Sequence, residues 1–221
     1  MQKSFSPHID VGQRGFLVIG VIAFFLVIVL TGALIAVLNT SLWHHLQVKY
    51  GVGSSYAPAI NQEVRSFFFS IQPHDFEAFN DAEDRHMADV RKVVHGGIIL
   101  LIISILVTAG VLLFLFFSVN PRKKMFQTIF FWTGIICIFL PFILMIIPFS
   151  SLFTAFHQML FPHGNWMFPP DSALLYYYPL GFFVDMAKFI VAMCIIAGFI
   201  GIECSRHITR ILFSSEIPSG D

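Results

Sequence analysis

Four long runs of apolar residues alternate with more polar segments along this chain. The runs cover residues 15–38, 96–119, 125–149 and 179–204. A helix of about 20 apolar residues crosses the hydrocarbon core of a bilayer, and a backbone in lipid must satisfy its own hydrogen bonds. The pattern therefore predicts an all-α, polytopic membrane protein. We expect four transmembrane helices that form a single integral membrane domain over residues 1–221.

The composition agrees with this prediction. Hydrophobic residues make up 57% of the chain and charged residues 12%, against about 25% charged residues in a soluble domain. The first run is too long for the core of a signal peptide, and no clear small-x-small cleavage site follows it, so we interpret it as a retained helix. The three cysteines lie within or at the end of apolar runs, so we expect no disulfide framework. The net charge of zero gives no reason to expect a nucleic-acid partner.

Lysine and arginine residues predict the orientation of the four helices. They precede the first run, fill the turn between the second and third runs, and follow the fourth; they are Lys3, Arg14, Arg122, Lys123, Lys124, Arg206 and Arg210. The positive-inside rule makes this side cytoplasmic, so both termini face the cytoplasm of a cell whose plasma membrane the chain spans. The two long segments, residues 39–95 and 150–178, then lie on the extracellular face. Long connections of this kind usually carry function, so we expect the active site there.

The first outer segment ends in a predicted helix that continues into the second apolar run. Asp81 is the expected N-cap, and acidic residues follow it in the first turn, where the helix dipole favours them. His86 and Asp89 share one face at a spacing of three residues. Asp89 is therefore expected near His86, or paired with Arg85 four residues before it.

The second outer segment begins with an amphipathic pattern over residues 149–161. Its apolar residues recur at helical spacing, and His157 projects beside this stripe. We expect a helix that lies in the plane of the membrane interface. The sequence Pro162-His163-Gly164-Asn165-Trp166 then predicts a turn that ends the helix.

Histidine is the side chain whose ordinary pKa, about 6.5, allows proton transfer in both directions near neutral pH. His86 and His157 are the preferred candidates among nine histidines, because each lies on a predicted helix beside apolar residues. The chain contains no His-Glu-x-x-His motif and no Gly-x-Ser-x-Gly elbow. We therefore expect neither a metal ion nor another cofactor.

Two short motifs in these outer segments carry a resemblance to a known family. They are His86-Met87-Ala88-Asp89-Val90 and Phe156-His157-x-x-x-Phe161-x-x-Gly164-Asn165-Trp166. In these residues, and in the order of its four apolar runs, the chain resembles the lipoprotein intramolecular transacylases (Lit) of Gram-positive bacteria. The order of segments matches over nearly the whole chain, whereas the motifs occupy about a tenth of it.

The resemblance implies an acyltransferase that acts on diacylated bacterial lipoproteins. Such an enzyme moves the sn-2 acyl chain of the S-diacylglyceryl group to the α-amino group of the same N-terminal cysteine, which yields a lyso-form lipoprotein. The two functional histidines of the family correspond to His86 and His157. The roles of four further residues are our inference from their chemistry and are not taken from the family. We expect positioning or oxyanion support from Asp89, Arg85, Asn165 and Trp166: Asp89 could hold the His86 tautomer, and Asn165 could donate to the oxyanion.

The residues permit this chemistry because the substrate brings its own nucleophile. An amine with a pKa near 8 needs a base for its proton, and the departing glycerol oxygen needs an acid. Two histidines are enough for both tasks. Two alternatives remain: a metal-dependent hydrolase of outer-leaflet lipids that uses His86, Asp89 and His157, and a non-enzymatic membrane scaffold.

Overall fold

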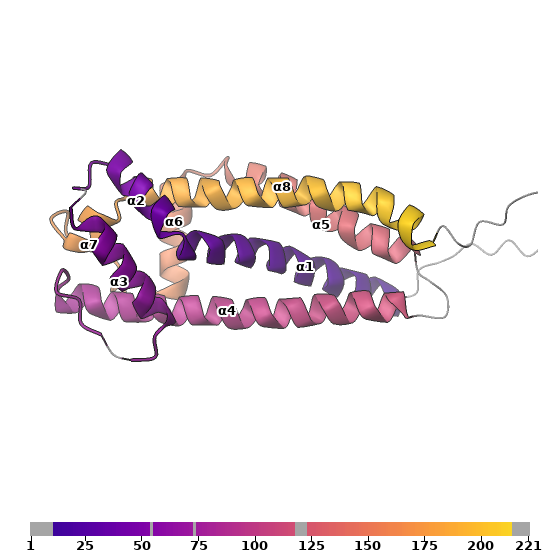
Figure 1. Ribbon diagram of the computed structural model, residues 1–221, viewed down its shortest axis with the longest axis horizontal. Helices are drawn as coiled ribbons and strands as arrows, with labels where there is room; N and C mark the ends of the chain where they lie inside the picture. Colours follow the sequence, from indigo (N-terminus) through magenta and orange to yellow (C-terminus); the bar gives the residue numbers. More distant parts are fainter. Residues whose placement is uncertain (1–10, 54, 73, 118–122, 214–221) are drawn as a thin grey trace, which may run out of the picture. The chain divides into compact units, whose positions relative to one another are not determined.

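The computed structural model describes residues 11–53, 55–72, 74–117 and 123–213. Within these residues every regular element is a helix (Figure 1). The helices are α1 (Val11–Leu38), α2 (Thr40–Lys49), α3 (Ala57–Phe69), α4 (Asp81–Phe116), α5 (Lys123–Leu144), α6 (Phe149–Leu160), α7 (Ala173–Tyr177) and α8 (Leu180–Phe213). The all-α prediction is confirmed.

Four of these helices are long and apolar enough to cross a membrane. They are α1, α4, α5 and α8, which confirms the four transmembrane helices predicted from the apolar runs. The cytoplasmic placement of both termini stays a prediction. Several cations on which it rests, namely Lys3, Arg122 and the side chains of Lys123 and Arg210, lie outside the described residues.

The third apolar run is the one whose end was predicted wrongly. We expected one span over residues 125–149, but α5 ends at Leu144 and α6 begins at Phe149. Pro148 lies directly before α6 with φ −53° and ψ 132°, an extended conformation that ends helical geometry. Proline also disfavours the helical conformation in the residue before it. Two other ends also differ: α4 ends at Phe116, and α8 continues beyond residue 204 to Phe213.

The chain divides into two compact units. Unit 1 comprises the described residues within 1–28, 102–139 and 195–221, and unit 2 comprises those within 29–101 and 140–194. In unit 1 an apolar core includes Leu115 and Ile129. A Cβ at Gly134 would lie 2.6 Å from the carbonyl oxygen of Gly198, so glycine allows α5 and α8 to approach closely there.

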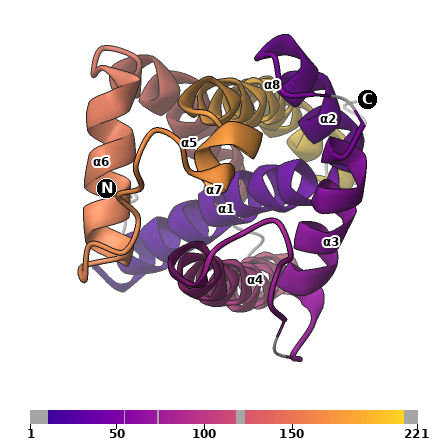
Figure 2. The ribbon, with the colours of Figure 1, turned by 90° about the vertical axis from the view of Figure 1, so that its left-hand side faces the viewer.

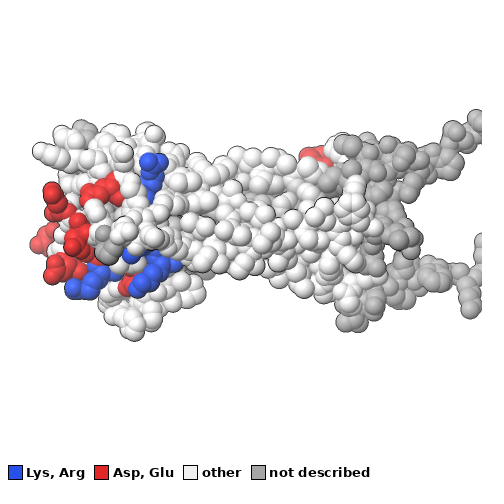
Figure 3. Space-filling view, turned by 60° about the horizontal axis from the view of Figure 1, so that its bottom comes forward, with Lys and Arg blue, Asp and Glu red and all other residues white. Residues whose placement is uncertain are grey.

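Unit 2 contains α2, α3, α6, α7 and the polar first turns of α4, which are the elements of both predicted outer segments. On the face drawn in Figure 3, the acidic and basic side chains of this unit gather at one end. Its apolar core includes Trp43, Val64, Phe67 and Tyr178. Fully buried Gln47 and Asn61 exchange side-chain hydrogen bonds of 2.6 and 3.0 Å across α2 and α3. Such satisfied buried polar pairs specify one packing arrangement.

The start of α4 is fixed by a reciprocal cap rather than by Asp81. The side chain of Asn80 accepts the backbone N–H groups of Ala82 and Glu83, at 2.9 and 3.1 Å, and Glu83 accepts the N–H of Asn80 at 2.8 Å. This is a capping box with Asn80 as the N-cap, one residue before the predicted position. Glu83 is 1% exposed and also accepts the backbone N–H of Leu174 at 2.9 Å. One buried carboxylate thus joins α4 to α7.

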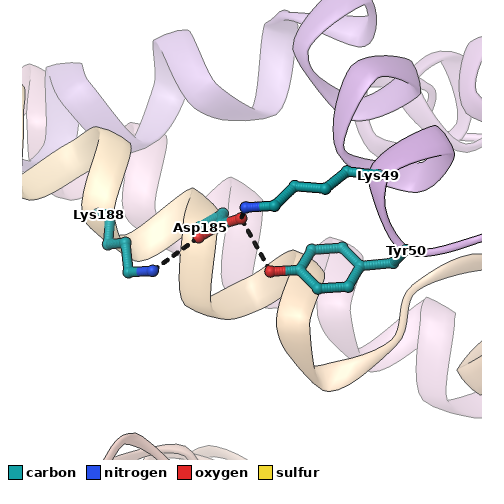
Figure 4. Close-up of polar contacts among 4 residues, drawn as sticks. All are labelled: Lys49, Tyr50, Asp185 and Lys188. Atoms are coloured by element: carbon teal, nitrogen blue, oxygen red, sulfur yellow. Dashed lines mark hydrogen bonds and ion pairs between the residues drawn. The ribbon is translucent and has the colours of Figure 1, made fainter.

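A second polar contact joins α2 to the first turns of α8. Asp185 forms ion pairs with Lys49 and Lys188 and accepts the hydroxyl of Tyr50 at 2.8 Å (Figure 4). A side chain at Gly181 would overlap the Tyr50 ring, so glycine makes room for the tyrosine. This contact fixes the end of α2 against α8 within unit 2.

Candidate active site

His86 lies on α4 one turn after Glu83 and is buried among aromatic rings. The residue is 6% exposed. Its ring centroid is 4.9 Å from that of Phe161 and 5.4 Å from that of Phe168. Nδ1 is buried and has no hydrogen-bond partner among the described residues. An unpaired polar atom in such surroundings is costly, which marks it as a candidate for contact with a ligand.

His157 lies on α6 and has a defined tautomer. Its Nδ1 is 2.8 Å from the carbonyl oxygen of Phe153. Because a carbonyl oxygen only accepts, Nδ1 carries the hydrogen, and Nε2 of the neutral ring has a free lone pair. Partial burial lowers the pKa of His157 below its ordinary value of 6.5, opposed by the hydrogen bond to Phe153. This ring is therefore suited to accept a proton near neutral pH.

The structure brings the two predicted histidines together. Their ring centroids are 6.2 Å apart, and the ring planes differ by 24°. Phe161 contacts both rings, and the ring centroid of Trp166 lies 5.0 Å from that of His157. Figure 2 shows α6 on one side of unit 2 and α2 with α3 on the other. The site is thus formed where α6 and the loop after it meet α4.

Asp89 and Asn165 are in direct contact, which the sequence did not predict. The Asn165 side-chain N–H donates to Asp89 Oδ2 at 2.7 Å, and Lys92 pairs with Asp89 Oδ1 at 2.7 Å. Asp89 is thus paired with Lys92, and the alternative pairing with Arg85 is wrong; the Arg85 side chain is exposed. One N–H of the Asn165 amide thus goes to a carboxylate, and the expected donation of Asn165 toward an oxyanion stays a prediction. Its Oδ1 atom is buried without a partner among the described residues.

α6 differs from every other element of the site because none of its residues is buried. Phe156 and Met159 are exposed apolar side chains. Phe153 contacts Phe183 of α8 at 5.4 Å between ring centroids. The helix predicted over residues 149–161 is therefore present as α6, and its position in the plane of the membrane interface stays a prediction.

Two parts of the site escaped the sequence analysis. Phe168, which packs on His86, lies beside Pro169 and Pro170 in a loop without helical periodicity. The sequence held a signal for the role of Glu83. An asparagine followed three residues later by a glutamate, as Asn80 is by Glu83, is a capping-box pattern. The second contact of Glu83, to Leu174, spans 91 residues and leaves no local signal.

Among the described residues, no group of three or more His, Cys, Asp or Glu side chains is placed to hold a metal ion. The three ligands that the hydrolase alternative requires, His86, Asp89 and His157, all lie in that part of the chain. They do not converge on one point.

Comparisons with known proteins bear on the family and the fold. The family model described as lipoprotein intramolecular transacylase Lit matches residues 18–183. The chain is similar to the structure of the membrane-integral transacylase Lit from Bacillus cereus, with a TM-score of 0.76 and 15% sequence identity over 92% of this chain and 96% of the other. Two variants of that protein, with one histidine replaced by arginine or alanine, give TM-scores of 0.76 and 0.75 at 14% identity. The first covers 92% of this chain and 94% of its own, and the second 90% and 94%. No curated protein matches.

Proposed function

Because this chain belongs to the lipoprotein intramolecular transacylase (Lit) family and is therefore a membrane-integral acyltransferase, we propose that it transfers an acyl chain within a diacylglyceryl lipoprotein. The sn-2 acyl chain moves to the α-amino group of that lipoprotein's N-terminal cysteine. The family thus favours acyl transfer over both the metal-dependent hydrolase and the scaffold. The observation that carries the detailed proposal is the pair of histidine rings, 6.2 Å apart, from two separate helices.

The reaction exchanges one bond for another. The amine nitrogen attacks the carbonyl carbon of the sn-2 ester, a C–N bond forms, and the C–O bond to the glycerol breaks. One proton leaves the nitrogen and one proton reaches the glycerol oxygen. The nucleophile and the ester belong to one molecule, so the enzyme gains rate by holding them in a reactive geometry. No serine or cysteine nucleophile is required.

The tautomer of His157 supports a division of labour between the histidines. His157 has a lone pair on Nε2 and is assigned as the base that takes the proton from nitrogen and later delivers it to the glycerol oxygen. His86 has an unpaired, buried Nδ1. When it carries the hydrogen, that atom donates to the developing oxyanion, the task first expected of Asn165.

The apolar surroundings of the pair suit a lipid substrate. The exposed Phe156 and Met159 on α6 offer contact surface to acyl chains, and Phe161 and Phe168 line the histidines. Both histidines lie in segments that the charge distribution assigns to the extracellular face. We therefore place the active site at the outer leaflet, where diacylated lipoproteins are anchored.

Mass spectrometry of a reporter lipoprotein tests the proposal. The chain would be produced together with a diacylated reporter in cells that lack this activity, and the N-terminal peptide would be fragmented. Transfer within one molecule leaves the total mass unchanged, so the fragments must place one acyl chain on nitrogen and one on the glycerol. A reporter that keeps a free α-amine and both glycerol esters would contradict the proposal.

The pH dependence gives a second prediction. A neutral His157 and a neutral amine are both required. Because burial lowers the pKa of His157 below 6.5, the base is already neutral between about pH 6.5 and 8, where only the amine titrates. We expect log kcat/KM to rise with a slope of about one over this range and to become steeper only below about pH 6.5. A slope of two that persists above pH 7 would contradict a lowered His157 pKa. His86 and Asp89 are the nearby titratable groups.

A further inference from the structure

Two acceptor groups of the site are not used by the proposed acid–base chemistry. They are the Asp89 carboxylate and the Oδ1 atom of Asn165. The two side chains are held together by a hydrogen bond of 2.7 Å that Asn165 Nδ2 donates to Asp89 Oδ2. The Oδ1 atom of Asn165 is buried and has no partner among the described residues. His86, which is 6% exposed and also carries an unpaired nitrogen, is three residues before Asp89 on the same helix face.

These groups match a cation with several hydrogen atoms to donate. A carboxylate and an amide oxygen only accept hydrogen bonds, and the carboxylate adds a negative charge. A primary ammonium has three N–H donors and no acceptor, so it fits this set, whereas an ester oxygen or an oxyanion does not. Lys92 already pairs with the other oxygen of Asp89, but its side chain is 78% exposed. Water screens such a pair and leaves the carboxylate attractive to a second cation.

We propose that Asp89 and Asn165 form the subsite that binds the α-ammonium group of the lipoprotein's N-terminal cysteine. This inference rests on the proposed function, because it supplies the place from which the amine attacks. The ammonium first loses one proton, by way of His157 Nε2, to solvent. The neutral amine then attacks, and its second proton follows the route to the glycerol oxygen.

The contacts explain why this subsite would lie beside both histidines. Asp89 shares its helix face with His86. Asn165 directly precedes Trp166, whose ring centroid lies 5.0 Å from that of His157. The loop that carries Asn165 also supplies Phe161 and Phe168, which pack on His86. Asp89 and Asn165 would orient the nitrogen while His157 accepts its proton.

Binding of two matched lipopeptides tests the subsite. One is an S-dipalmitoylglyceryl-cysteine peptide with a free α-amine, and the other is the same peptide with an N-acetyl group, which removes the charge. Affinities would be measured for the full chain in lipid nanodiscs at pH 6.5, with His157→Gln present throughout to prevent turnover. We expect the free-amine peptide to bind on the order of tenfold more tightly, as for a hydrogen bond to a charged group.

The variants separate recognition from support of the fold. Asp89→Asn and Asn165→Leu should each remove most of the preference for the free amine and leave the affinity for the acetylated peptide unchanged. Lys92→Gln, the matched control on the same carboxylate, should keep the preference. The subsite is overturned if the preference for the free amine persists in both variants, or if both variants lower the affinity for the two peptides equally. The contact between Asp89 and Asn165 then only holds the loop in place.

The outcome is distinguishable from failure of the proposed function. Transfer by the wild-type chain, read by mass spectrometry, tests the reaction and does not depend on the subsite. If transfer occurs but neither variant changes the preference, only the subsite fails. If the preference depends on Asp89 but no acyl chain moves to nitrogen, the subsite stands and the reaction is wrong.

Discussion

His157→Ala will lower kcat/KM for acyl transfer by about 10²-fold or more, because the substitution removes the proposed base. Among the described residues of the site, His157 is the one whose hydrogen bond fixes a tautomer with a free lone pair. The measurement is the rate at which N-acylated peptide forms from a diacylated lipopeptide in proteoliposomes. His157→Gln should be equally impaired, since an amide does not accept a proton at neutral pH.

The location of His157 makes this experiment easy to interpret. No residue of α6 is buried, so a substitution there opens no cavity in the apolar core. Gln158→Ala, at the exposed neighbouring position, is the matched control and should retain activity within a few-fold of wild type. If His157→Ala retains activity comparable to the control, His157 is not the base.

Glu83→Ala is expected to be the most destabilising single change near the site. The carboxylate accepts the backbone N–H groups of Asn80 and Leu174, at 2.8 and 2.9 Å, and the residue is 1% exposed. Each buried donor left unpaired costs about 1–3 kcal/mol. Glu83→Gln keeps one acceptor oxygen and should be intermediate between wild type and Glu83→Ala.

Thermal unfolding of the detergent-solubilised protein measures this effect, and Glu77→Ala is the control because Glu77 is an exposed acid in the same unit. We expect the midpoint to fall for Glu83→Ala and to stay within the error for Glu77→Ala. Activity should fall as well, because Glu83 fixes α7 against α4 one turn from His86. An unchanged midpoint would show that the two N–H groups find other acceptors.

The transmembrane helices were predictable because span length and apolar composition are properties of the chain alone. The break between α5 and α6 was missed because both sides of it are apolar; Pro148 was the only signal. The candidate histidines were found from helix position and the family motifs. The contact of Asp89 with Asn165 joins residues 76 apart in sequence, and neither helical periodicity nor spacing carries information about such a pair. The choice of Asp81 over Asn80 as the cap failed because both are good N-cap residues; the glutamate three residues after Asn80, which favours Asn80, was not taken into account.

The exposure of α6 has a consequence for the surroundings in which the enzyme works. A helix that carries the proposed base, and none of whose side chains is fully buried, leaves part of the wall around the substrate to be built by the bilayer. On the proposed function, neighbouring phospholipid tails would line the acyl chain on the side that the protein leaves open. Acyl-chain selectivity would then depend on membrane thickness and fluidity as well as on the amino-acid sequence.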